Sequence, residues 1–222
     1  PSLLLYWLQN EPMYWSHTPR YRELFQQHLK EKYRSAASLN SVWQSEYRDI
    51  GEADFPTKEN KAAWYDWNVF HYGYVADFFR WQREQVKKHH PEALTTVKLV
   101  ADYMYLDAFV DHVGIDYEAF AEIHDVAGSD TFVNYHTWNP VKWNIRSGNI
   151  LFDFWKSVAP DKPISNTEFH QLQDVFPFEY ELDRGDFGRY IQTTYWQQYF
   201  HGLRLCTFWQ WTDSSHYHGV TR

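Results

Sequence analysis

The sequence predicts an α/β protein built on a parallel β-sheet. Five short segments that are apolar or β-branched alternate along the 222 residues with segments of helical periodicity. No internal repeat, low-complexity tract or Gly/Ser linker interrupts this alternation. Strands that alternate with helices form parallel sheets, because each helix carries the chain back to the edge where the next strand begins. We therefore expect five parallel strands within one domain.

The five expected strands differ in composition. Segment 3–8 is a continuous apolar run that is too short for a helix, which is typical of a strand buried on both faces. Segment 95–100 is β-branched and follows a change of period. The other three strands are expected at 131–135, 163–167 and 205–211.

Helical periodicity fills the intervals between the expected strands. Thr18 followed by Pro19 is a helix-start signal, with a capping hydroxyl and a proline at the first helical position. A short helix then contains Leu39–Trp43, and a long helix runs from about Glu59 to His89 and ends before Pro91. The remaining helices are expected at 116–123, 151–158 and 187–199.

The aromatic content is high, with 12 Trp, 17 Tyr and 16 Phe making up 20% of the residues. Large rings with one polar edge are suited to a sugar-binding cleft, because pyranose C–H faces stack on them, although a ring-rich core is the alternative. A stripe of rings on the long helix is interpreted as core, with at most one ring in a subsite. Its members are Trp64, Trp67, Phe70, Tyr74, Phe78 and Trp81.

The charge and the content of metal-ligating residues argue against several classes of partner and of metal site. With 21 Lys plus Arg against 29 Asp plus Glu, the net charge of −8 argues against nucleic acid and anionic membrane as partners. No segment approaches the roughly 20 apolar residues of a membrane span. Cys206 is the only cysteine, which rules out a cysteine-rich zinc site. His216 and His218 lack a convincing third ligand, so neither a metal nor another cofactor is expected.

Two glutamates stand where expected strands end. Glu11 follows the first strand and Glu168 follows the fourth, although glutamate is a poor turn residue. In parallel sheets the chemistry lies at the carboxyl ends of the strands. Hydrolysis of a glycosidic bond needs two carboxyl groups, one on each side of the sugar. The pair therefore predicts a glycosidase site, in which the adjacent Asn10 could bind a sugar hydroxyl.

Several motifs resemble those of known glycoside hydrolases. Segment 7–12, Trp-Leu-Gln-Asn-Glu-Pro, resembles the acid/base motif that ends the fourth strand in the retaining (β/α)8 enzymes of clan A. Segment 163–168, Pro-Ile-Ser-Asn-Thr-Glu, resembles the seventh-strand nucleophile motif of that clan. Segments 29–33 and 39–43 are similar to a stretch typical of family 42 β-galactosidases, and 201–211 is similar to the eighth strand of that family.

This resemblance implies a fold and a set of roles. The fold would be a (β/α)8 TIM barrel, of which strands 4 to 8 are present. Glu11 would be the general acid/base, Glu168 the nucleophile and Asn10 the partner of the sugar 2-hydroxyl, while Tyr135 would hold the nucleophile ionised. The other implied substrate-binding residues are Trp209, the stacking platform Trp211, and His218.

The resemblance also implies an activity. We expect a retaining hydrolase that cleaves terminal β-galactosides and binds an oligosaccharide or β-galactoside, with homo-oligomerisation of the full-length protein left open. The alternatives are another clan A β-glycosidase, such as a β-agarase or a β-mannosidase, and a non-catalytic carbohydrate-binding protein. Because a (β/α)8 barrel needs about 250 residues, residues 1–222 would be the C-terminal part of a single catalytic domain that lacks the first three β/α units. We expect the chain alone to be poorly soluble and inactive.

Overall fold

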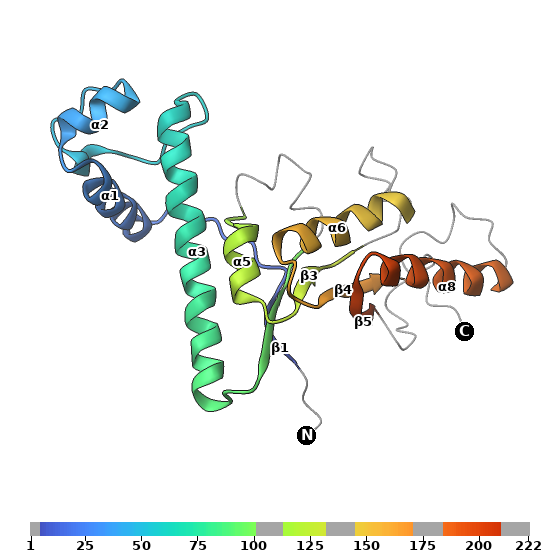
Figure 1. Ribbon diagram of the computed structural model, residues 1–222. Helices are drawn as coiled ribbons and strands as arrows, with labels where there is room; N and C mark the ends of the chain where they lie inside the picture. Colours follow the sequence, from blue (N-terminus) through green and yellow to red (C-terminus); the bar gives the residue numbers. More distant parts are fainter. Residues whose placement is uncertain (1–4, 101–112, 132–144, 171–183, 210–222) are drawn as a thin grey trace. The chain divides into compact units, whose positions relative to one another are not determined.

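The computed structural model describes residues 5–100, 113–131, 145–170 and 184–209 (Figure 1). It divides into two compact units, one that contains the strands and one that is helical. The long helix α3 (Lys61–His89) contributes to both, because its residues up to Trp81 belong to the helical unit and those from Gln82 belong to the strand unit. None of the helices in the described ranges is both long and apolar enough to cross a lipid bilayer.

The strands that the structure describes pair in parallel, as predicted. They are β1 (Leu5–Asn10), β2 (Leu94–Lys98), β3 (Ala127–Ser129), β4 (Ile164–His170) and β5 (Leu203–Trp209). β1 pairs with β2, and β3, β4 and β5 form a second ladder in that order. Two backbone bonds join the ladders, from the Asp130 N–H to the Leu99 carbonyl at 2.7 Å and from the Asp125 N–H to the Thr95 carbonyl at 2.8 Å. The strands therefore follow one another in chain order.

The third strand that the structure describes lies earlier than the predicted one. A strand was expected at 131–135, of which residues 132–135 lie outside the described ranges, whereas β3 occupies Ala127–Ser129, where no strand was predicted. The cause is the close approach of β3 to β4: Gly128 has a φ of +153°, and a Cβ on it would lie 2.0 Å from the Ser165 carbonyl oxygen. Only small residues fit there, and small residues carry no β-strand signal in a sequence.

Three helices of the strand unit follow the predicted order. They are α5 (Tyr117–Ile123), α6 (Ile145–Val158) and α8 (Arg184–Phe200). The Lys162 ammonium donates to the carbonyls of Ala121 and His124, so it neutralises the carbonyl end of α5.

The buried face of α8 was predicted only in part. Helical spacing predicts that Thr194, Tyr195 and Tyr199 belong to the apolar face, and Thr194 is buried, but Tyr195 and Tyr199 are exposed, and the unpredicted Gln198 is buried. The Gln198 side-chain oxygen accepts a hydrogen bond from the Asn166 side chain at 3.2 Å. A polar contact to β4 therefore sets the orientation of the helix, which hydrophobic periodicity could not show.

The helical unit begins as the sequence predicts. It contains α1 (Pro19–Tyr33), α2 (Ala36–Trp43) and the 3-10 turn η1 (Ile50–Glu52). The Thr18 hydroxyl caps α1 by accepting from the Tyr21 N–H at 3.3 Å, and Pro19 is the first helical residue. The expected start signal is confirmed.

The core of the helical unit takes up part of the aromatic content. Phe25, Trp43, Trp67 and Phe70 are buried together there. The stripe on α3 is only partly core, since its later rings are exposed; these rings are Tyr74, Phe78 and Trp81.

One buried carboxylate, Asp66 of α3, connects this helix with α1 and α2. It accepts from Lys32 Nζ at 2.5 Å and the Tyr33 hydroxyl at 2.6 Å, both on α1, and from Trp43 Nε1 at 2.8 Å on α2. Three donors satisfy the buried charge, which would otherwise cost folding free energy.

His124 makes the stability of the strand unit depend on pH. Its ring is fully buried, 5.4 Å from the Trp155 ring, and neither ring nitrogen has a hydrogen-bond partner among the described residues. Burial lowers the pKa of His124 to about 3, and the nearby Lys162 ammonium adds to the effect while Asp125 opposes it. Because the unfolded chain then binds the proton more tightly, protonation favours unfolding.

We expect the free energy of unfolding to fall as the pH drops below about 6.5, and the His124 ring alone should account for about 1.4 kcal/mol per pH unit. The loss of unfolding free energy between pH 7 and pH 5 should therefore be roughly 2 kcal/mol larger in the parent than in His124→Leu. His89→Leu, at an exposed position of α3, is the matched control and should keep the parent slope. An equal slope in the parent and His124→Leu would contradict this account.

Candidate active site

Glu11 lies directly after β1, in an uncommon backbone conformation. Its φ is +46°, in the left-handed region that glutamate rarely adopts, and its N–H donates to the Lys98 carbonyl at 2.8 Å. The register between β1 and β2 shifts between Trp7 and Asn10, just before it. The side chain is 40% exposed. Such irregularities redirect side chains and are common beside functional sites, where strain is maintained by the surrounding structure.

Glu168 lies within β4 at a second irregularity. The register with β5 shifts between Asn166 and Phe169. The Glu168 N–H donates to the Asn166 side-chain oxygen at 3.1 Å, and Glu168 is only 6% exposed. This carboxylate is therefore almost fully withdrawn from water, unlike that of Glu11.

Lys98, the last residue of β2, connects the two glutamates. Its ammonium contacts Glu11 Oε1 at 3.0 Å, Asp130 Oδ2 at 3.1 Å and the carboxylate of Glu168. The residue is 2% exposed. One buried cation thus meets carboxylates that follow or belong to β1, β3 and β4.

Asp130 is the third carboxylate of this cluster and is fully buried. Its Oδ1 accepts from the Thr167 hydroxyl at 2.6 Å. The adjacent Thr131 donates its N–H to the Asn166 side-chain oxygen at 3.1 Å. Asn166 thus holds both the Glu168 backbone and the segment that follows β3, which fixes the two carboxylates relative to each other.

The charges in this cluster change its proton affinities. Burial alone would lower the pKa of the Lys98 ammonium, but the carboxylates of Asp130, Glu168 and Glu11 outweigh burial and raise that pKa above its usual value. Burial raises the pKa of Asp130, against the opposing effects of Lys98 and Thr167. Lys98 is therefore cationic throughout the neutral range, and Asp130 takes up a proton more readily than an exposed aspartate.

The spacing of the carboxylates suits a particular chemistry. One oxygen from each of Glu11, Asp130 and Glu168 lies within 4.8 Å of the others. Retaining glycosidases hold their two carboxyl groups about 5–5.5 Å apart, whereas inverting enzymes need about 6.5–9.5 Å. The closest oxygens of the two glutamates are therefore nearer to each other than the carboxyl groups of inverting enzymes are.

Three such oxygens could also coordinate a hard cation such as Mg²⁺ or Ca²⁺. Lys98, however, already brings its ammonium against an oxygen of each carboxylate. The cluster has its own positive charge, and the expectation that no metal is needed stays a prediction.

The structure describes only some of the other predicted site residues. Asn10 is the last residue of β1, is exposed, and stands opposite Lys98 in the ladder. Trp209 is the last residue of β5. Tyr135, Trp211 and His218 lie outside the described ranges, as does His216. The structure thus brings together Glu11 and Glu168, with Asn10 beside them.

Lys98 and Asp130 are site residues that were not predicted from the sequence. Lys98 stands in an otherwise apolar and β-branched strand, and a charge inside such a run is a signal that could have been used. Asp130 was missed because β3 was expected four residues later, which placed Asp130 before that strand rather than at its carboxyl end.

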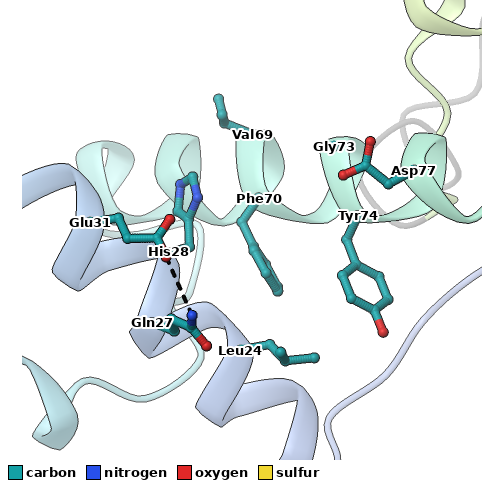
Figure 2. A pocket seen from close by; sticks show the side chains of 9 residues that line it. All are labelled: Leu24, Gln27, His28, Glu31, Val69, Phe70, Gly73, Tyr74 and Asp77. Atoms are coloured by element: carbon teal, nitrogen blue, oxygen red, sulfur yellow. Dashed lines mark hydrogen bonds between the residues drawn. The ribbon is translucent and has the colours of Figure 1, made fainter.

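The helical unit has hollows of its own. A groove of about 300 Å³ lies between α1 and α3 (Figure 2), with Phe70 and Tyr74 directed toward α1 and Gln27 donating to Glu31 at 3.3 Å. A second hollow, of about 290 Å³, is lined by Trp15, Trp64 and other rings. No predicted site residue lines either of them.

Known proteins match this chain along almost its whole length. The model of the glycoside hydrolase 42 family, described as β-galactosidase, matches residues 1–219. β-Galactosidase Pbg of Clostridium perfringens is 24% identical over 227 residues, an alignment that covers 96% of this chain and 31% of that protein. The chain spans a third or less of the length of the relatives that it matches.

Solved structures share its fold. The β-galactosidase of Bacillus circulans sp. alkalophilus superposes with a TM-score of 0.75 at 19% identity, covering 99% of this chain and 33% of that one. The exo-carrageenase GH42 of Bacteroides ovatus gives a TM-score of 0.71 at 25% identity, covering 87% of this chain and 28% of that one. The parallel strands β1 to β5, in chain order, are accordingly part of a (β/α)8 barrel. The chain therefore belongs to glycoside hydrolase family 42.

Proposed function

We propose that the protein is a retaining glycosidase that releases terminal β-galactose, with Glu168 as nucleophile and Glu11 as general acid/base. The observation that carries the proposal is that Glu11 and Glu168 have oxygens within 4.8 Å of each other. Their unequal environments support distinct roles, because Glu168 is buried against Lys98 while Glu11 is 40% exposed. A nucleophile must remain ionised, whereas an acid/base must exchange protons with water.

In the first step a Glu168 oxygen attacks the anomeric carbon as the bond from that carbon to the glycosidic oxygen breaks. Glu11 gives its proton to the departing oxygen, so the aglycone leaves as a neutral alcohol and the sugar is held as an ester of Glu168. Attack from one face inverts the anomeric carbon.

In the second step Glu11, now a carboxylate, takes a proton from a water molecule. The water oxygen attacks the anomeric carbon and the ester bond to Glu168 breaks, which inverts the carbon again and restores both glutamates. Two inversions give net retention of configuration.

The other sequence-predicted residues complete the proposal. Asn10, beside Glu11, would bind the 2-hydroxyl, and Tyr135 would hold the nucleophile ionised. Trp209, Trp211 and His218 would bind the sugar. That residues 1–222 form the C-terminal part of one catalytic domain stays a prediction.

The stereochemistry of the first product tests this proposal. We expect proton NMR of the complete protein acting on p-nitrophenyl β-galactoside to show β-galactose first, with α-galactose appearing only at the rate of spontaneous mutarotation. α-Galactose as the first product would contradict the double displacement. A protein that binds galactosides without turnover would support the non-catalytic alternative.

Hydrolysis of carrageenan is a second candidate. The family 42 exo-carrageenase shares 25% identity with this chain, above the 19% of the Bacillus circulans β-galactosidase. A panel of carrageenan oligosaccharides, agarose oligosaccharides and p-nitrophenyl β-galactoside and β-mannoside separates these substrates, and also tests the β-agarase and β-mannosidase alternatives. We expect the largest kcat/KM on the β-galactoside, and a larger value on carrageenan oligosaccharides would favour the second candidate.

A further inference from the structure

We infer that Lys98 is a positioning residue for this reaction, whose ammonium keeps Glu168 ionised and fixes its distance from Glu11. The inference rests on the proposed function, because that proposal gives the two glutamates their roles. It goes further by assigning a task to a residue of β2 that acts on both of them.

The contacts of Lys98 support this role. Its ammonium is buried and touches Glu168, Glu11 at 3.0 Å and Asp130 at 3.1 Å. These carboxylates follow or belong to three different strands, and the Lys98 ammonium contacts all three of them. Moving it would change the spacing of the glutamates, on which a retaining mechanism depends.

The charge balance supports it as well. With all three carboxylates ionised, the cluster carries −3 + 1 = −2, and without Lys98 it would carry −3. Three carboxylates with oxygens within 4.8 Å of one another, two of them buried, cannot all remain ionised without a cation, so a proton would be taken up. A proton shared with Glu168 would remove the nucleophile.

The test is the pH profile of kcat/KM for p-nitrophenyl β-galactoside in Lys98→Met of the complete protein. We expect the acidic limb to move up by one or more pH units, since an opposite charge at this distance shifts carboxyl titration by 1–3 units. At a pH below the acidic limbs of both the parent and Lys98→Met, the ratio of parent kcat/KM to variant kcat/KM should be at least tenfold larger than the same ratio at the optimum pH. A purely structural role would lower the whole profile without moving its limbs.

Two variants control the experiment. Lys87→Met removes a lysine near the opposite end of β2, where it pairs with Asp125 at 3.0 Å and donates to the Ala93 carbonyl. The limbs of the pH profile of this variant should therefore stay where they are in the parent. Lys98→Arg keeps the positive charge, so its limbs should stay within about half a unit while kcat falls because the guanidinium is larger.

If Lys98→Met does not fold, the comparison is made in an Asp130→Asn background. That change removes the most deeply buried carboxyl group of the cluster, so Lys98→Met with Asp130→Asn is compared with Asp130→Asn alone. We again expect an upward shift of one unit or more in the acidic limb.

An unshifted acidic limb in folded Lys98→Met, or in the double variant, would overturn the inference. Such a result leaves the proposed function intact if Glu168→Gly is inactive and regains turnover with added azide. If azide does not restore turnover, it is the assignment of Glu168 that fails, so the two failures are distinguishable.

Discussion

Replacing Glu168 by glycine is expected to lower kcat on p-nitrophenyl β-galactoside by roughly 10⁵-fold. Glycine removes the carboxylate that would form the covalent intermediate and leaves a space at the anomeric carbon. Water alone cannot replace it, because Glu11 stands on the other side of the sugar in the proposed geometry. The Lys98 contact is lost as well, but Asp130 and Glu11 still balance the ammonium.

Added azide should restore turnover of Glu168→Gly. The anion fits the vacated space, attacks the anomeric carbon as Glu11 protonates the leaving oxygen, and gives α-galactosyl azide by a single inversion. Glu122→Gly is the matched control, because Glu122 is an exposed glutamate on α5, and it should keep activity within about twofold. Residual activity of Glu168→Gly above about 1% without azide would contradict its role as nucleophile.

Replacing Gly128 by alanine is expected to destabilise the protein by about 3 kcal/mol or more. The new Cβ would lie 2.0 Å from the Ser165 carbonyl oxygen, a backbone atom that cannot rotate away, and the φ of +153° is unfavourable for alanine. β3 would have to separate from β4. The substitution lies two residues before Asp130, so we also expect loss of activity in the protein that remains folded.

Gly73→Ala is the control for this prediction. Nothing lies within 4 Å of a Cβ at Gly73, an exposed position on α3, so alanine should be neutral or stabilise by up to about 1 kcal/mol. Urea denaturation followed by circular dichroism measures both variants. Equal stability of Gly128→Ala and the parent would show that the β3–β4 contact differs from the one described.

The sequence was sufficient to predict the parallel α/β architecture and the meeting of Glu11 with Glu168. Both follow from local signals: the alternation of periods places the strands, and parallel strands bring their carboxyl ends to one edge. The capped start of α1 at Thr18 is equally local.

What the sequence did not show depends on long-range contacts. The position of β3 is set by the room that β4 leaves beside Gly128, and the face of α8 by the contact of Gln198 with Asn166. The partners of Lys98 are 32 to 87 residues away along the chain, so no spacing rule reveals them. Only the anomaly of a charge in an apolar strand was visible.

The most direct test of the central claim is to trap the covalent intermediate. The complete protein is incubated with 2-deoxy-2-fluoro-β-galactosyl fluoride, whose fluorine slows hydrolysis of the ester, and is then digested and mapped by mass spectrometry. The account predicts one fluorogalactosyl group on the peptide that contains Glu168, and none in Glu168→Gly. Labelling of Glu11 or of another residue, or turnover of the reagent without any adduct, would contradict it.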